Sequence, residues 1–253
     1  MVYITGDCHA DFSKFNEEFF PEQNEMTRDD FVIVCGDFGI WHDTPEERSK
    51  LNWLAHKNFT ILFVDGNHEN YDRLYGDEFP IVDFHGGKAH QIRENIFHLL
   101  RGYIFDICGK GFFAFGGASS HDIMDGILDP SNYETDEEFK EAYIEWYRAG
   151  KMFRVNHYSW WKQEMPSSEE RKFGLKTLAE RKYKVDYIIS HCCPQKITTY
   201  FSRGMYKPDK LTAYFDSVAK CTEFNHWYFG HYHHNERYFG KYTVLYEEFE
   251  RIV

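Results

Sequence analysis

The chain has 253 residues, of which 42% are hydrophobic and 19% aromatic, and it carries a formal net charge of −12. This length and hydrophobic content predict a globular protein with a substantial core and exclude an intrinsically disordered chain. The acidic balance argues against a protein that wraps duplex nucleic acid, because neutralising phosphates requires clustered Lys and Arg.

No apolar run approaches the roughly 18 residues that a membrane-spanning helix needs, so we expect no membrane partner. The sequence begins with an apolar run and lacks a basic or signal-like stretch before it. Six cysteines show neither disulfide nor zinc-ligand spacing, which is typical of reduced thiols. We therefore expect a cytoplasmic protein.

Strand and helix patterns alternate over the first third of the chain. Continuous apolar runs predict buried parallel strands at Val2–Thr5, Phe31–Cys35 and Thr60–Val64. A stripe of phenylalanines at helical spacing predicts a helix over Asp11–Phe20. Thr44-Pro45-Glu46-Glu47 combines an N-cap residue, a first-turn proline and a capping-box glutamate, which predicts the start of another helix.

The middle of the chain has a different pattern. Ile96–Leu100, Tyr103–Ile107 and Phe112–Phe115 are short apolar runs that predict an antiparallel meander. A polar and aromatic stretch follows at about residues 119–184, and a helix is predicted at Asp136–Tyr147.

Another helix is predicted to begin at Ser167, because Ser167 and Glu170 have capping-box spacing. Two interpretations of the 119–184 stretch stay open. It is either an insertion that covers the rim of a functional site, or ordinary helical packing on one face of a sheet.

Alternation returns in the last third. Strands are predicted at Val185–Ser190, His226–Phe229 and Tyr242–Tyr246, and a helix at Asp209–Lys220. The chain contains no internal repeat, low-complexity tract or Pro/Gly-rich linker. We therefore predict one domain over residues 1–253, with the insertion at about 119–184.

Most of the predicted strands are followed immediately by residue types that bind metals. The clusters are Gly6-Asp7-Cys8-His9, Gly36-Asp37, Gly66-Asn67-His68-Glu69, Ser190-His191 and Gly230-His231-Tyr232-His233. Asp7, Asp37 and Asn67 are spaced by about thirty residues, the length of one strand-helix-strand unit. Such spacing places them together at the carboxyl ends of neighbouring strands. Oxygen and imidazole ligands on one rim can hold two divalent cations, which predicts a dinuclear metal hydrolase.

Each cluster suggests a particular role. The carboxylate of Asp37 can bridge two metals through its two oxygens, and the carbonyl oxygen of Asn67 suits a hard or borderline cation. His68 follows that ligand and would lie near the metals without binding them, where a general acid should be. Glu69 is expected to orient a neighbour or to cap the following helix. Cys8 should point away from the metals because side chains alternate along an extended segment.

In this order, each after a strand, the clusters resemble the motif set of the calcineurin-like metallophosphoesterase superfamily from Asp7 to His233. The resemblance implies an α/β fold of two packed mixed β-sheets flanked by helices, a four-layer sandwich with the site at strand ends. It also implies a ligand set. One metal would be held by Asp7, His9 and His233, the other by Asn67, His191 and His231, with Asp37 as the bridge.

The implied activity is hydrolysis of a phosphate monoester or diester by a hydroxide that bridges two metal ions, with His68 assisting the leaving alkoxide. The cations would be divalent or mixed-valence. Manganese and iron are expected first, and zinc and nickel also suit these ligands. The expected substrate is a small phosphoester or a nucleotide.

Two positions depart from the family pattern. Ala10 stands where glycine is common, which is a mild change. The second motif reads Gly36-Asp37-Phe38-Gly39-Ile40-Trp41, whereas the Ser/Thr protein phosphatase branch has an arginine that grips the substrate phosphate. The missing arginine argues against a protein phosphatase.

Alternative functions are a nuclease of the same superfamily, disfavoured by the acidic charge, and a non-catalytic scaffold, disfavoured because all candidate ligands and His68 are present. Within the insertion, His121, Arg154 and His157 are interpreted as surface or packing residues in preference to substrate contacts. Trp160 and Trp161 are expected to pack the insertion onto the sheet.

Overall fold

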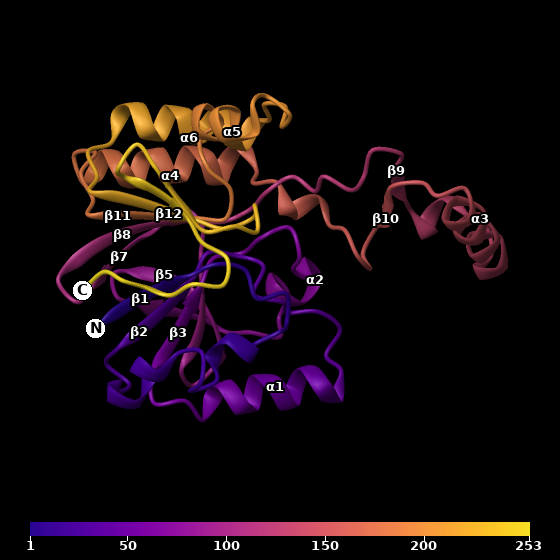
Figure 1. Cartoon of the computed structure of the whole chain (residues 1–253). Coiled ribbons are helices and arrows are strands. Elements are labelled where there is room, and N and C mark those ends of the chain that lie inside the picture. The colour runs from indigo at the N-terminus through magenta and orange to yellow at the C-terminus, as the bar shows by residue number, and fades with distance from the viewer.

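Two large mixed β-sheets pack face to face in the computed structural model, which describes residues 1–253, and helices cover both outer faces (Figure 1). The predicted four-layer α/β sandwich is therefore confirmed. None of the helices combines the length and apolar character needed to cross a lipid bilayer.

The first sheet has seven strands in the order β15-β1-β2-β3-β6-β5-β4. Its strands are β1 (Val2–Thr5), β2 (Phe31–Val34), β3 (Thr60–Phe63), β4 (Ile81–Phe84), β5 (Gly87–Arg93), β6 (Ile96–Leu99) and β15 (Glu250–Arg251). Strands β1, β2, β3 and β6 run parallel, and β4, β5 and β15 make antiparallel pairs at the edges.

The second sheet has six strands in the order β13-β14-β12-β11-β8-β7. They are β7 (Ile104–Ile107), β8 (Lys110–Phe115), β11 (Tyr187–Ser190), β12 (His226–Phe229), β13 (Glu236–Tyr238) and β14 (Tyr242–Val244). The four central strands are parallel, and both edge strands are antiparallel. The short strand β13 lies outside β14 and forms the edge of the sheet. The strand predicted at Tyr242–Tyr246, which corresponds to β14, is therefore not the edge strand.

Helix ends follow the predicted capping residues. The helices are α1 (Pro45–Ala55), α2 (Tyr71–Leu74), α3 (Asp136–Arg148), α4 (Ser168–Glu180), α5 (Gln195–Ser202) and α6 (Lys210–Cys221). Thr44 accepts a hydrogen bond from the backbone N–H of Glu47 at the start of α1, and Ser167 and Glu170 form a capping box at the start of α4.

Central strands are buried on both faces because one face meets the other sheet and the opposite face meets helices. In β2, Phe31 and Ile33 belong to the inter-sheet core, while Val32 and Val34 face the side covered by α1. In β8, Phe112 packs between the sheets. Helices cover both outer faces of the sandwich, so the central strands have no face exposed to water. Strands buried on both faces have continuous apolar sequences.

The predicted helix over Asp11–Phe20 is wrong. Within the segment only Ser13–Phe15 forms a 3-10 helix, and a second one, Pro21–Glu25, follows it. The side-chain amide of Gln23 donates to the carbonyl oxygens of Phe15 and Phe20, and at Phe15 it takes the place of the backbone donor that a helix would supply. Two phenylalanines of the stripe are buried in the core, whereas Phe19 is 62% exposed.

The predicted meander is wrong in part. Strands β7 and β8 are an antiparallel pair, but β6 belongs to the other sheet, where it lies parallel to β3. The chain therefore crosses between the sheets after β6, and periodicity carries no information on which sheet a buried strand joins. The β4–β5 hairpin and helix α5 were not predicted.

The stretch over residues 119–184 divides into two parts. Strands β9 (Gly126–Leu128) and β10 (Phe153–Val155) pair in parallel and, with α3, project from the body of the molecule (Figure 1). Helix α4 instead packs on the second sheet and contributes Leu178 to its core. Ordinary packing on a sheet therefore describes α4, while β10 extends toward the rim.

A buried charged network joins the turn after β3 to the crossover between the sheets. The carboxylate of Asp65 is fully buried and accepts hydrogen bonds from Arg101 Nε at 2.9 Å and from Tyr71 Oη at 2.8 Å. Burial raises the pKa of Asp65, but Arg101 and His98 outweigh burial and hold it below its usual value. The guanidinium also contacts Glu170 of α4 at 3.2 Å, so two ion pairs of one arginine connect the turn after β3, the crossover between the sheets and a covering helix.

We predict that Arg101→Met destabilises the protein by about 3–5 kcal/mol, because it leaves the buried Asp65 carboxylate without a counter-charge. Lys176→Met is the control, since its partner Glu180 is exposed and such pairs contribute about 1 kcal/mol or less. Urea unfolding of both variants measures the difference. A loss below about 1 kcal/mol in Arg101→Met would contradict the prediction.

Candidate metal centre

The candidate ligands converge because they follow parallel strands of both sheets. Asp7, Asp37 and Asn67 come after β1, β2 and β3 of the first sheet. His191 comes after β11 of the second sheet, and His231 begins the loop after β12. Carboxyl ends of parallel strands share one edge, so the seam between the two sheets brings the two sets of side chains together.

One group of ligand atoms involves the loop after β1. His233 Nε2 lies 3.2 Å from Asp7 Oδ2 and 3.0 Å from His9 Nε2, and His9 Nε2 lies 3.6 Å from the same carboxylate oxygen. Two imidazole nitrogens and a carboxylate oxygen at these separations can bind one cation.

A second group forms around His191. Its Nε2 lies 3.2 Å from Asn67 Oδ1 and 3.2 Å from Asp37 Oδ2, and its ring lies 4.9 Å from the ring of His231. Asp37 Oδ2 is also 3.7 Å from His9 Nε2 in the first group. The carboxylate of Asp37 therefore lies between the two groups, as a bridging ligand must.

Glycines allow the carboxylates to lie against the backbone. A Cβ on Gly66 would be 2.0 Å from Asp37 Oδ1, and one on Gly230 would be 2.1 Å from Asp7 Oδ1. In the space so left, Asp37 Oδ1 accepts from the N–H of His68 at 2.7 Å, and Asp7 Oδ1 accepts from the N–H of His231 at 2.9 Å. The N–H of His231 also lies 3.2 Å from Asp7 Oδ2, so the backbone holds one oxygen of Asp37 and contacts both oxygens of Asp7.

Four candidate ligands have a positive φ. The values are 49° for His9, 47° for Asp37, 70° for His231 and 51° for His233. This conformation costs about 1–3 kcal/mol for a residue with a side chain, and it persists where surrounding structure enforces it. The strain thus lies in three of the loops that carry candidate ligands.

Electrostatics also fit a cationic occupant. Burial raises the pKa values of Asp7 and Asp37, but His191 and further histidines outweigh it and hold both below their usual range. Burial lowers the pKa of His191, yet the two carboxylates raise it well above its usual value. A proton on His191 thus balances the carboxylates here, and a metal cation would take over that role because metal ligands must be deprotonated.

His68 lies at the edge of the centre. Its Nε2 is 2.8 Å from Arg154 Nη2, and its ring is 4.8 Å from the ring of His9. A guanidinium can only donate, so this contact needs an unprotonated Nε2 and places the proton of neutral His68 on Nδ1. Burial lowers the pKa of His68 to about 4, with Asp37 raising it and Arg154 lowering it further.

Glu69 orients the loop after Asp37 and does not cap a helix. Its buried carboxylate accepts from the backbone N–H groups of Phe38 at 2.7 Å, Gly39 at 3.1 Å and Ile40 at 2.9 Å. Asn70 is the residue that caps the following helix α2. Three hydrogen bonds to one carboxylate fix the loop that carries the central ligand.

The amide of Asn67 is oriented by residues that the sequence did not single out. Asn67 Nδ2 donates to Ser120 Oγ at 3.4 Å, and Ser120 Oγ donates to Glu164 at 2.6 Å. Glu164 also accepts from the backbone N–H of Ser120 at 2.8 Å. This series of hydrogen bonds orients the amide so that Asn67 Oδ1 faces His191. No spacing rule links positions 67, 120 and 164, so sequence reasoning had no signal for them.

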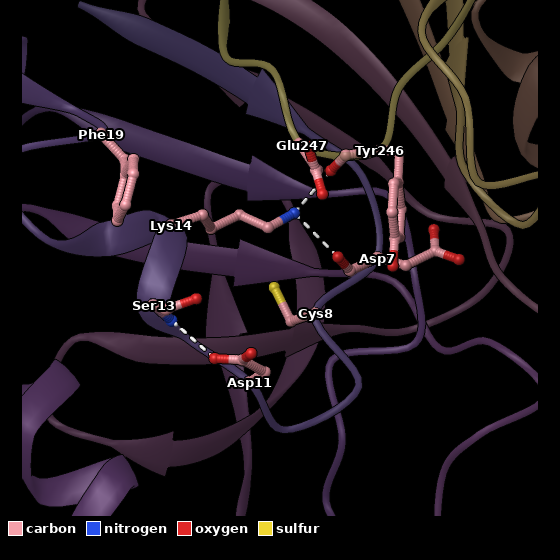
Figure 2. A pocket seen from close by; sticks show the side chains of 8 residues that line it. All are labelled: Asp7, Cys8, Asp11, Ser13, Lys14, Phe19, Tyr246 and Glu247. Carbon is pink, nitrogen blue, oxygen red and sulfur yellow. Dashed lines mark hydrogen bonds between the residues drawn. The ribbon is translucent and has the colours of Figure 1, made fainter.

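Lys14 supports the end of β1. Its ammonium donates to the carbonyl oxygens of Asp7 at 2.7 Å and Tyr246 at 2.6 Å (Figure 2). It also donates to the carbonyl oxygen of Gly6 at 3.1 Å. The side chain thus satisfies the carbonyls where β1 ends and joins them to a loop near the C-terminus. Cys8 lies in the core beside them, as predicted.

The insertion residues differ in their positions. His157 is 60% exposed and contacts Asp72 at 2.8 Å, and Trp161 is buried and donates to Asp72 at 2.7 Å, in agreement with surface and packing roles. The ring of His121 lies 4.7 Å from that of His231. Arg154 is not on the surface: it is buried and packs against His68 at the edge of the centre.

A family model described as Calcineurin-like phosphoesterase matches residues 1–191, well over half of the chain. The chain belongs to the calcineurin-like phosphoesterase family, whose members are dinuclear metal-dependent hydrolases of phosphoesters. No curated protein matches the chain. The match ends at His191, so the positions of His231 and His233 in the centre rest on geometry.

We predict that Asp37→Asn lowers the bound metal content and abolishes hydrolysis together, because it removes the charge shared by both groups. Asparagine tolerates the positive φ at this position, so the loop keeps its conformation. Elemental analysis and turnover are measured alongside Asp29→Asn, an exposed control. Two metals and full turnover in Asp37→Asn would refute the bridge.

We predict that Ser120→Ala weakens metal binding by about 10–100-fold, because the Asn67 amide loses the group that orients it. Calorimetric titration of the metal-free protein with Mn²⁺ measures the affinity. Ser217→Ala on α6, whose hydroxyl contacts only its own helix, is the matched control. An affinity within twofold of the unmodified protein would count against the orienting role.

Proposed function

We propose that this chain hydrolyses a phosphate monoester or diester at a dinuclear metal centre. Asp7, His9 and His233 would hold one cation, and the other would be held by Asn67, His191 and His231. The observation that carries the proposal is the position of Asp37, whose Oδ2 faces His191 at 3.2 Å and His9 at 3.7 Å. A single carboxylate shared by two ligand groups is the geometry that a two-metal site requires.

When bound, two cations supply a hydroxide nucleophile at neutral pH and neutralise the charge on the phosphoryl group. The donor set mixes carboxylate and amide oxygens with imidazole nitrogens. Manganese and iron are the metals we expect first for such a set, and zinc and nickel are also compatible with it. The availability of each metal decides among them.

His68 is proposed as the general acid. It lies beside the centre, and Asn67 already provides the ligand from that loop. Its pKa is low in the free protein, but a bound phosphate dianion raises it again, because a nearby negative charge favours the imidazolium form. The added proton at Nε2 replaces the hydrogen bond from Arg154 Nη2, and the protonated ring can then pass a proton to the leaving alkoxide.

A small phosphoester or a nucleotide is the proposed substrate. Asp11 and Glu247 line a pocket on one side of Asp7, and Asp122 stands beside Arg154 on another. These carboxylates repel a polyanionic strand, which disfavours a nuclease. A scaffold without activity is disfavoured because the candidate ligands and His68 lie together.

A hydrolysis screen tests the proposal. It covers p-nitrophenyl phosphate, bis(p-nitrophenyl) phosphate, nucleotides and single-stranded DNA, with Mn²⁺, Fe²⁺, Zn²⁺ and Ni²⁺ supplied in turn. Metal-dependent turnover of the small esters that Asp37→Asn lacks supports the proposal. Metal binding without turnover of any ester would favour the scaffold.

We predict that His68→Asn slows hydrolysis of an alkyl phosphate by about 10²–10⁴-fold and of p-nitrophenyl phosphate only modestly. A nitrophenolate leaves without a proton, whereas an alkoxide needs one. Steady-state rates on both esters and the metal content are measured for the same preparation. Equal losses on both esters, or loss of a metal with the imidazole, would place His68 among the ligands.

A further inference from the structure

The loop after Asp37 provides no cation for a phosphoryl group. Its next residues are Phe38, Gly39, Ile40 and Trp41, of which the first three are buried. A dianionic phosphate in a partly enclosed site needs positive charge beyond the metals, preferably a guanidinium that can donate two hydrogen bonds at once.

The cations Lys14, Arg73 and Arg101 are already engaged with other partners. The ammonium of Lys14 is bound to backbone carbonyls below β1, and Arg101 is buried against Asp65. Arg73 is paired with Glu47 and Glu78. These groups have donors fixed on other partners and do not point into the centre.

Arg154 is the exception, and it comes from the insertion. The strand β10 carries its guanidinium to the rim, where Nη2 lies 2.8 Å from His68 Nε2 and Nη1 donates to the carbonyl oxygen of Asn67 at 3.2 Å. Only 8% of the side chain is exposed. The guanidinium therefore touches both the candidate acid and the loop of a candidate ligand.

The guanidinium is held rigidly and keeps one donor free. Nε donates to Asp122 at 2.9 Å, and Nη1 also contacts the carbonyl oxygen of Ser159 at 3.4 Å. Arginine has five N–H donors. The contacts with Asp122, Asn67, Ser159 and His68 engage four of them and leave one N–H of Nη2 without a partner.

We propose that Arg154 binds a non-bridging oxygen of the substrate phosphoryl group, and so supplies from the insertion the cation that the loop after Asp37 lacks. The inference rests on the proposed function. The free N–H of Nη2 lies beside His68, so an oxygen that it binds is held next to the group proposed to protonate the leaving oxygen. Asp122 holds the guanidinium of Arg154 in place before the substrate binds, which reduces the entropy lost on binding.

A purely structural role makes a different prediction. If Arg154 only held His68 and the Asn67 loop in place, its removal would change metal content or turnover and leave phosphate affinity alone. Binding of inorganic phosphate to the Mn²⁺-loaded protein separates the two roles, because it needs no bond cleavage and no general acid.

Isothermal calorimetry with inorganic phosphate is the test. Arg154→Gln is expected to raise the phosphate Kd by about 10–100-fold, the range for loss of a hydrogen bond to a charged group, with Mn²⁺ content unchanged. The KM for p-nitrophenyl phosphate should rise by a similar factor. Arg148→Gln, an exposed arginine of the same insertion on α3, should match the unmodified protein.

Arg154→Lys keeps the charge with a single donor group and is expected to recover part of the affinity, remaining about threefold or more weaker than arginine. If thermal melting shows that Arg154→Gln is not folded, the phosphate affinity of Arg154→Lys becomes the test of the inference. Unchanged phosphate affinity in the folded Gln variant, or in the Lys variant where it stands alone, would overturn the inference. Absence of turnover in the unmodified protein with Arg154-dependent phosphate binding would refute the proposed function alone.

Discussion

The arrangement of the two sheets and of the centre depends on two buried carboxylates, Asp7 and Asp37, at the seam between the sheets. Negative charge in a protein interior is costly unless it is neutralised and hydrogen-bonded. Here the neutralising group, His191, belongs to the second sheet, while the carboxylates belong to the first. Assembly of the sandwich and assembly of the centre are therefore one event. Gly66 and Gly230, the positive φ values and the backbone N–H contacts all serve to bring these charges within ligand distance.

Much of this could be predicted from the sequence, for reasons visible at particular residues. Strands β1, β2 and β3 are buried on both faces, so they appear as continuous apolar runs, and Asp7, Asp37 and Asn67 interrupt those runs where each strand ends. The helix starts at Thr44 and Ser167 follow from local capping chemistry. Both kinds of signal depend on residues a few positions apart, and for that reason they survive in the sequence.

Contacts between distant positions carried no such signal. Ser120 and Glu164 orient Asn67, and Arg154 reaches His68, through the path of the insertion alone. The assignment of β6 to the first sheet depended likewise on a free edge beside β3. The predicted helix over Asp11–Phe20 failed because side-chain donors satisfied its carbonyls, a competition that apolar periodicity cannot detect.

The bond from Lys14 to the carbonyl of Tyr246 has a consequence for the order in which this chain can mature during synthesis. Asp7 is made long before its partner His233 and before the edge strand β15 that pairs with β1. Such long sequence separations make folding slow and late. A centre that includes His233 is therefore complete only after that residue has emerged from the ribosome.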